Sequence, residues 1–142
     1  MFDRTLIRFT RPTLAAMLIA TAASSARADA VIDWNIHAND LIVEAKMGTP
    51  PAVRLMAIVQ TAVYDAVGEV ARAAAMGPQA GTPLPSLDAA VAAANRAVFA
   101  RALPGQQNAI QAAYQTALAG ISGAAERDAG IAIGERAAAA VL

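Results

Sequence analysis

The chain has 142 residues, of which 11 are Lys or Arg and 11 are Asp or Glu, and it contains no cysteine. This length allows one domain or less, and the lack of a basic cluster argues against nucleic-acid binding, which uses a clustered basic face. Without cysteine there can be neither disulfides nor thiolate sites, so packing alone must stabilise the fold.

Residues 1–28 have the pattern of a secretory signal peptide. A basic segment is followed by a short apolar stretch, Thr13 to Ala23, and by the small-x-small cleavage site Ala26-Arg27-Ala28. The stretch is shorter than the roughly 20 residues that a membrane-spanning helix needs, so we predict a cleaved leader and no stable membrane span. We therefore expect an exported protein, periplasmic or secreted, whose mature residues 29–142 carry seven basic and ten acidic side chains.

The residues after the leader predict an all-α fold, a bundle of about five helices, because no period-2 run is long enough for a strand. The first predicted helix covers residues 31–46 and has Asp33 as a candidate cap. Its residues available for burial are Trp34, Leu41 and either Ile42 or Val43.

One face of this first helix carries the polar residues Asp33, His37, Asp40 and Glu44, at the spacing i, i+4, i+7 and i+11. A divalent-metal site or a carboxylate-tuned base is one interpretation. The other is a solvated polar face, which is what such charge runs usually mark. We favour the solvated face, since His37 is the only histidine and cannot complete a zinc site.

The second predicted helix begins at Thr49 and runs to about Ala75. Thr49 can cap it, and Pro50 or Pro51 fits a first turn, where a missing N–H costs nothing. At 100° per residue the apolar and polar side chains separate onto opposite halves of the helix. The core half holds Leu55, Ile58, Val59, Ala62, Val63, Ala66, Val67 and Val70, and the polar half holds Arg54, Gln60, Thr61, Tyr64, Asp65, Glu69 and Arg72.

The polar half of this helix must find partners elsewhere. Arg54 and Asp65 share a side but lie three turns apart, roughly 16 Å at 1.5 Å per residue, so they cannot pair with each other. Glu69 can pair with Arg72 at i, i+3. We expect these side chains to anchor the helix to its neighbours by hydrogen bonds, because no base or nucleophile lies beside them.

Three further helices are predicted. Residues 76–85 hold two glycines and three prolines and form a loop. Ser86 then caps a third helix that ends near Pro104, with Asp88 in its first turn. A fourth covers residues 106–121, and a fifth begins around Ala124 after Ser122, which we interpret as a cap.

The third helix is rich in alanine, with eight alanines among residues 89–102. Alanine favours helix but supplies little apolar area, so such a helix must pack closely. Gly130 and Gly134 have the small-xxx-small spacing that allows close approach, and we predict a tight crossing within the chain. No stop signal follows residues 134–142, so we expect an incomplete part of a larger helical domain.

These blocks together resemble a known family. The blocks that carry the resemblance are, in order, Asp33-Trp34-Asn35, Pro50-Pro51-x-x-Arg54, residues 62–67 (Ala-Val-Tyr-Asp-Ala-Val), an alanine-rich helix and Gly130-x-x-x-Gly134. Through these blocks the chain resembles the N-terminal helical region of bacterial exported vanadium-dependent haloperoxidase-like proteins. These belong to the type 2 phosphatidic acid phosphatase (PAP2) superfamily. The resemblance covers about residues 33–142. It implies a helical bundle in which basic residues and a serine hold vanadate or phosphate, and a histidine bonds the metal or attacks the phosphate.

The motifs that perform this chemistry in the family do not occur in this sequence. They are a Lys-x6-Arg-Pro block, a Pro-Ser-Gly-His block and a Ser-Arg-x5-His-x3-Asp block. Lys46 is followed seven positions later by Val53, and the only Arg-Pro pair, Arg11-Pro12, lies in the leader. The resemblance therefore assigns no catalytic, cofactor-binding or metal-binding residue to this chain, and the vanadate of the relatives has no ligands here.

We therefore expect this chain to be the N-terminal scaffold portion of an exported haloperoxidase-like or phosphatase-like protein. It lacks the vanadate- and phosphate-binding motifs, so we expect it to be inactive alone. Whether it is part of an enzyme is left open. Its expected partners are the missing C-terminal catalytic helices or a homo-oligomer. The alternative is a small periplasmic helical module that binds a partner through an alanine-rich or apolar face.

Overall fold

The structure is a computed structural model, and it describes residues 30–77 and 82–142. The predicted leader, residues 1–28, lies outside the described residues. The described chain is an all-α bundle of five helices without a strand, as predicted. A first helix over residues 30–44 is followed by α2 (Thr49–Met76), α3 (Leu87–Ala102), a 3-10 turn (Pro104–Gln106), α4 (Gln107–Ala119) and α5 (Ala124–Val141).

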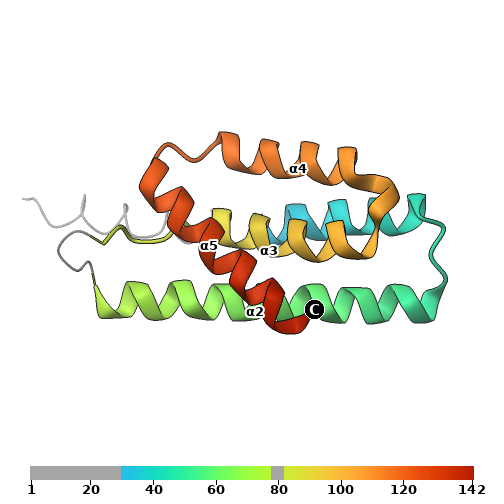
Figure 1. Cartoon of the computed structure of the whole chain (residues 1–142), viewed down its shortest axis with the longest axis horizontal. Coiled ribbons are helices and arrows are strands. Elements are labelled where there is room, and N and C mark those ends of the chain that lie inside the picture. The colour runs from blue at the N-terminus through green and yellow to red at the C-terminus, as the bar shows by residue number, and fades with distance from the viewer. Residues whose placement is uncertain (1–29, 78–81) are drawn as a thin grey trace, which may run out of the picture.

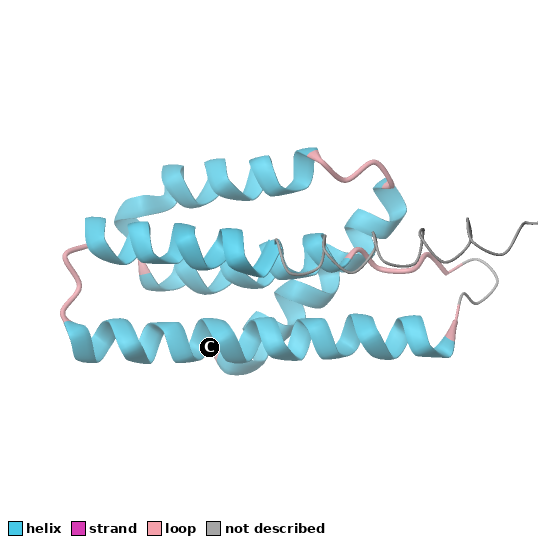
Figure 2. Cartoon of the chain, turned by 180° about the vertical axis from the view of Figure 1, so that it is seen from behind, coloured by secondary structure: helices cyan, strands magenta, loops and turns pink. Residues whose placement is uncertain are grey.

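The bundle is built around α3, which contacts α2, α4 and α5. Figure 1 shows α2 along one long edge and α4 along the opposite edge, with α3 and the first helix between them. From the end of α4 the chain turns back through α5, which crosses α3 obliquely and reaches the middle of α2. Figure 2, from behind, shows the first helix beside α3 on the opposite side of the bundle from α5. No described helix is both long and apolar enough to span a membrane.

The core half predicted for the second helix is confirmed. Six of its eight residues are buried, while Ile58 and Val67 are half-buried. On the first helix, Trp34 and Leu41 are buried. Of the two alternatives for the next buried position, Ile42 is half-buried, whereas Val43 points outward and is 66% exposed. The largest fully buried side chains are Phe99, Ile110, Val59, Val91 and Val98.

Two helix starts differ from the predicted caps. The N-cap of α2 is Gly48 and not Thr49, because Ala52, the first residue after the two prolines with an N–H, donates to the Gly48 carbonyl oxygen at 3.1 Å. The N-cap of α5 is Gly123 and not Ser122, and it makes no side-chain cap bond. Ser86 is confirmed, since its Oγ accepts from the amide of Ala89 at 3.3 Å.

The first helix also starts and ends earlier than predicted. Residue 30 is already helical, so Asp33 lies within the helix and does not cap it. At the other end, Lys46 adopts the left-handed conformation with φ 50°. Its amide donates to the Val43 carbonyl at 2.9 Å, and the Met47 amide donates to the Ile42 carbonyl at 3.2 Å. This pair of bonds is a Schellman C-terminal cap, and it ends the helix at residue 44.

The tight crossing predicted from Gly130 and Gly134 is confirmed within the chain, where α5 packs on α3. A β-carbon on Gly134 would collide with the Ala90 carbonyl oxygen and lie 2.8 Å from the Ala93 β-carbon. One on Gly130 would collide with the Ser86 carbonyl oxygen. The crossing also holds a backbone bond, in which the Ser86 amide donates to the Glu126 carbonyl at 2.8 Å. The small side chains on both helices therefore let the two backbones come close together. Close packing supplies the van der Waals contact that large apolar side chains supply elsewhere.

Candidate functional site

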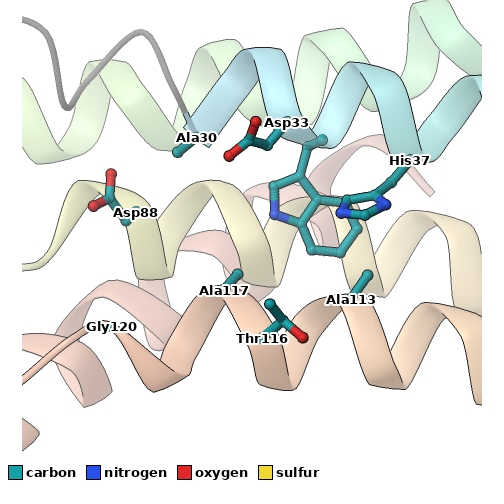
Figure 3. A pocket seen from close by; sticks show the side chains of 9 residues that line it. Ala30, Asp33, His37, Asp88, Ala113, Thr116, Ala117 and Gly120 are labelled. Atoms are coloured by element: carbon teal, nitrogen blue, oxygen red, sulfur yellow. The ribbon is translucent and has the colours of Figure 1, made fainter.

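A groove opens between the first helix and α4. It has a volume of about 370 Å³ and continues into a second hollow of about 190 Å³ that shares His37 and Ala113 with it. The α4 wall consists of small residues, which leaves the space between the two helices unfilled (Figure 3). The residues that line the larger hollow are Ala30, Asp33, Trp34, His37, Asp88, Ala113, Thr116, Ala117 and Gly120.

Trp34 and His37 form the aromatic part of this groove. Their ring centroids lie 5.9 Å apart at an interplanar angle of 71°, an edge-to-face contact. Trp34 is buried whereas His37 is exposed, and Figure 3 shows Asp88 toward the other end of the groove from His37. Within the described residues His37 makes no hydrogen bond, so no nucleophile or orienting carboxylate is paired with it.

The predicted polar face of the first helix lies along this groove. Asp33 and His37 line the larger hollow, and His37, Asp40 and Glu44 line the smaller one. All four are exposed. Asp33 and Glu44 are eleven residues apart, roughly 16 Å along the helix, which is too far to ligate one ion. Among the described residues no three His, Asp or Glu side chains converge to hold a metal.

Among the described residues, the polar half of α2 is anchored to other helices at Gln60 and Glu69. Gln60 donates to the Asn35 Oδ1 on the first helix at 2.6 Å. Glu69 pairs with Arg136 on α5, so the predicted pairing with Arg72 is wrong. The reason is tertiary: α5 crosses α2 at the level of Glu69 and brings a guanidinium to it from 67 positions along the chain.

The residues that carry the family resemblance on α2 do not anchor it to described neighbours, contrary to our prediction. In the described ranges, the side chains of Arg54, Tyr64 and Asp65 make no hydrogen bond or ion pair. All three are exposed, and Tyr64 is 78% exposed, whereas Trp34 and Tyr114 are buried. These side chains lie on a free surface of α2.

A second polar cluster, which sequence reasoning did not predict, joins α3, α4 and α5. The Arg96 guanidinium carbon lies 4.9 Å from the centroid of the Tyr114 ring, and Arg96 Nη2 pairs with Glu135 at 2.8 Å. Burial raises the pKa of Tyr114, while the charge of Arg96 acts in the opposite direction. Arg96 and Glu135 are 39 positions apart, so no local spacing could reveal the pair.

Comparison with known proteins finds no matching family model, no matching curated protein and no matching solved structure. Among the described residues, the groove beside Trp34 and the outer side of α2 are the surfaces that carry residues of the resemblance.

Proposed function

We propose that the chain is the N-terminal scaffold portion of an exported vanadium haloperoxidase-like or PAP2-type phosphatase-like protein. It acts by packing against catalytic helices that carry the vanadate- or phosphate-binding motifs, and it does not turn over substrate alone. The observation that carries this proposal is the exposure of Arg54, Tyr64 and Asp65, which make no polar contact with the described residues. These three residues of the resemblance therefore lie on a surface where another segment can pack.

The groove beside Trp34 is the surface that we assign to the catalytic helices. It is lined by residues of the Asp33-Trp34-Asn35 block, which also belongs to the resemblance. Its α4 wall is made of Ala113, Thr116 and Ala117, so larger side chains from another helix can enter it. Filling it would bury the exposed ring of His37, which lies edge-to-face with the buried Trp34.

The coding DNA beyond the codon for Leu142 tests the proposal. The same frame, or a neighbouring one, is expected to encode the Lys-x6-Arg-Pro, Pro-Ser-Gly-His and Ser-Arg-x5-His-x3-Asp blocks. A stop codon with no neighbouring frame that encodes them would refute the scaffold role.

The second candidate function is a small periplasmic module that binds a partner through an apolar face. Ile32, Ile36 and Val43 favour it, since all three are more than half exposed and recur on one side of the first helix. The behaviour of residues 29–142 in solution separates the two functions. A module unfolds cooperatively as a defined species, whereas an incomplete scaffold binds hydrophobic dye and melts broadly.

A further inference from the structure

We propose that the outer side of α2 binds the outer side of α2 in a second copy of the chain, as an antiparallel pair with two-fold symmetry. This inference can fail without the proposed function, because that function assigns the groove, and not this side of α2, to the catalytic helices. It uses Arg54, Tyr64 and Asp65 for their exposure and charge, and not for their place in the resemblance. It follows from the positions of four exposed side chains on one helix.

The outer side of α2 is a continuous ridge. Figures 1 and 2 both show α2 along an edge of the bundle, where the C-terminal end of α5, which crosses α2 near its middle, is the one other described segment that reaches this edge. The helix has 28 residues, so it extends for about 42 Å at 1.5 Å per residue. At 100° per residue, the side chains opposite its buried stripe include Arg54, Ala57, Thr61 and Asp65, all of which are exposed.

The two flanks of this ridge differ in chemistry. The bond between Gln60 and Asn35 fixes the flank beside the first helix, and the pair of Glu69 and Arg136 fixes the flank beside α5. Helical spacing places Val53 and Tyr64, 64% and 78% exposed, toward the first flank. It places Arg54 and Asp65 toward the second flank.

A two-fold axis midway between Arg54 and Asp65 satisfies both flanks at once. In an antiparallel pair this axis sets each Arg54 opposite the partner's Asp65. Within one helix the two side chains are roughly 16 Å apart and cannot pair, but across the axis they can. On the other flank, Tyr64 then lies about 3 Å along the axis from the partner's Val53. At the crossing, Thr61 meets the partner's Ala57, and these small side chains allow the helices to approach closely.

A second copy is the occupant that the charges favour. A two-fold interface requires that residue i contacts residue j and that j contacts i, and this helix carries opposite charges at matching distances from one point. The two ion pairs between Arg54 and Asp65 fix the register of one helix against the other, although exposed ion pairs contribute little affinity. The affinity comes from burial of the apolar area of Val53 and Tyr64. The first helix extends that area with its exposed Ile36, which the bond between Asn35 and Gln60 holds at the level of the axis.

Sedimentation equilibrium of the purified protein tests the pair through a charge swap. We expect a reversible dimer with a Kd on the order of micromolar, because one helical edge is a small interface. Each single reversal, Arg54→Asp or Asp65→Arg, should weaken dimerisation at least tenfold, since it places like charges opposite each other. The double reversal R54D/D65R should restore dimerisation to within about threefold of the original.

Arg101→Asp is the matched control, because Arg101 is an exposed arginine at the end of α3, away from the ridge, and its reversal should leave the dimer unchanged. All three substituted positions are exposed, and circular dichroism melts verify that each variant folds. A monomer at every concentration would overturn the inference, as would a dimer that is insensitive to the single reversals or not restored by the double one. Either result leaves the scaffold proposal standing, since the coding DNA tests that separately.

Discussion

At the scale of single residues, Tyr114 shows how burial and charge compete at one side chain. It is 7% exposed, and Arg96 lies over its ring. Burial is the larger influence and raises the pKa of the phenol above its ordinary value, while the guanidinium opposes that change. The neutral phenol is therefore the form that the folded state stabilises.

This raised pKa predicts a loss of stability at alkaline pH. The phenol of the unfolded chain ionises near pH 10, whereas the folded state resists ionisation. The contribution of Tyr114 is thus fully present below about pH 10 and is lost as the pH rises through the folded pKa. Urea unfolding at several pH values from about 8 to 11 should show a steeper fall in the free energy of unfolding for the original protein than for Tyr114→Phe.

The control for this measurement is Tyr64→Phe, which changes the exposed tyrosine of α2 and should retain the steeper fall. The interpretation is contradicted if Tyr114→Phe loses stability with pH as steeply as the original protein does.

At the scale of elements, the crossing of α5 on α3 depends on glycine. A β-carbon at position 134 would collide with the backbone at Ala90, so Gly134→Ala should lower the free energy of unfolding by about 1–3 kcal/mol through overpacking. Intrinsic helix propensity alone predicts the opposite sign, because glycine inside a helix costs about 0.5–1 kcal/mol relative to alanine. Urea unfolding of the variant decides between the two signs.

Gly120 offers the matched comparison, since a β-carbon there would meet nothing within 4 Å and the residue has φ −79° and ψ −6°. Gly120→Ala should be neutral or stabilise by up to about 1 kcal/mol. Equal effects of the two substitutions would show that the crossing is looser than described.

The contact between α2 and α5 predicts a second difference between elements. Arg136→Ala removes the partner of Glu69 and should destabilise the protein by about 0.2–1 kcal/mol, the range of exposed ion pairs. Arg72→Ala should have a smaller effect, because Arg72 forms no described ion pair although it lies one helical turn from Glu69. Chemical denaturation of the two variants checks this order, and the reverse order would favour the local pairing.

The elements also show how far the sequence predicts this fold. Periodicity and the Pro, Gly and Ser signals located all five helices and the buried half of α2, because these are local properties. The starts at Gly48 and Gly123 were missed, since they depend on which amide finds a carbonyl in three dimensions. The partner of Glu69 and the lack of an anchoring partner at Tyr64 do not follow from the sequence for a related reason: both depend on where α5 and the first helix lie against α2.

At the scale of the whole molecule, the candidate surfaces were only partly predictable. The shared face of Asp33, His37, Asp40 and Glu44 follows from helical spacing, and these residues do lie along one groove. The groove itself does not follow from spacing, because it exists only where the small side chains of α4 lie across from the first helix. The molecule therefore has two separate candidate surfaces. We propose that the groove beside Trp34 binds the catalytic helices and that the outer side of α2 binds a second copy of the chain.

We propose that this chain supports catalysis by packing against helices that carry the vanadate- or phosphate-binding motifs. The measurement that tests this is vanadate-dependent bromide oxidation by hydrogen peroxide, with phosphomonoester hydrolysis measured alongside, for the chain alone, for a separately produced helical segment that carries those motifs, and for the two mixed. We predict one of these activities above either component only in the mixture, reduced when Ala117→Arg fills the groove. Turnover by the chain alone, or a mixture no more active in either reaction than the motif-bearing segment, would contradict the scaffold role.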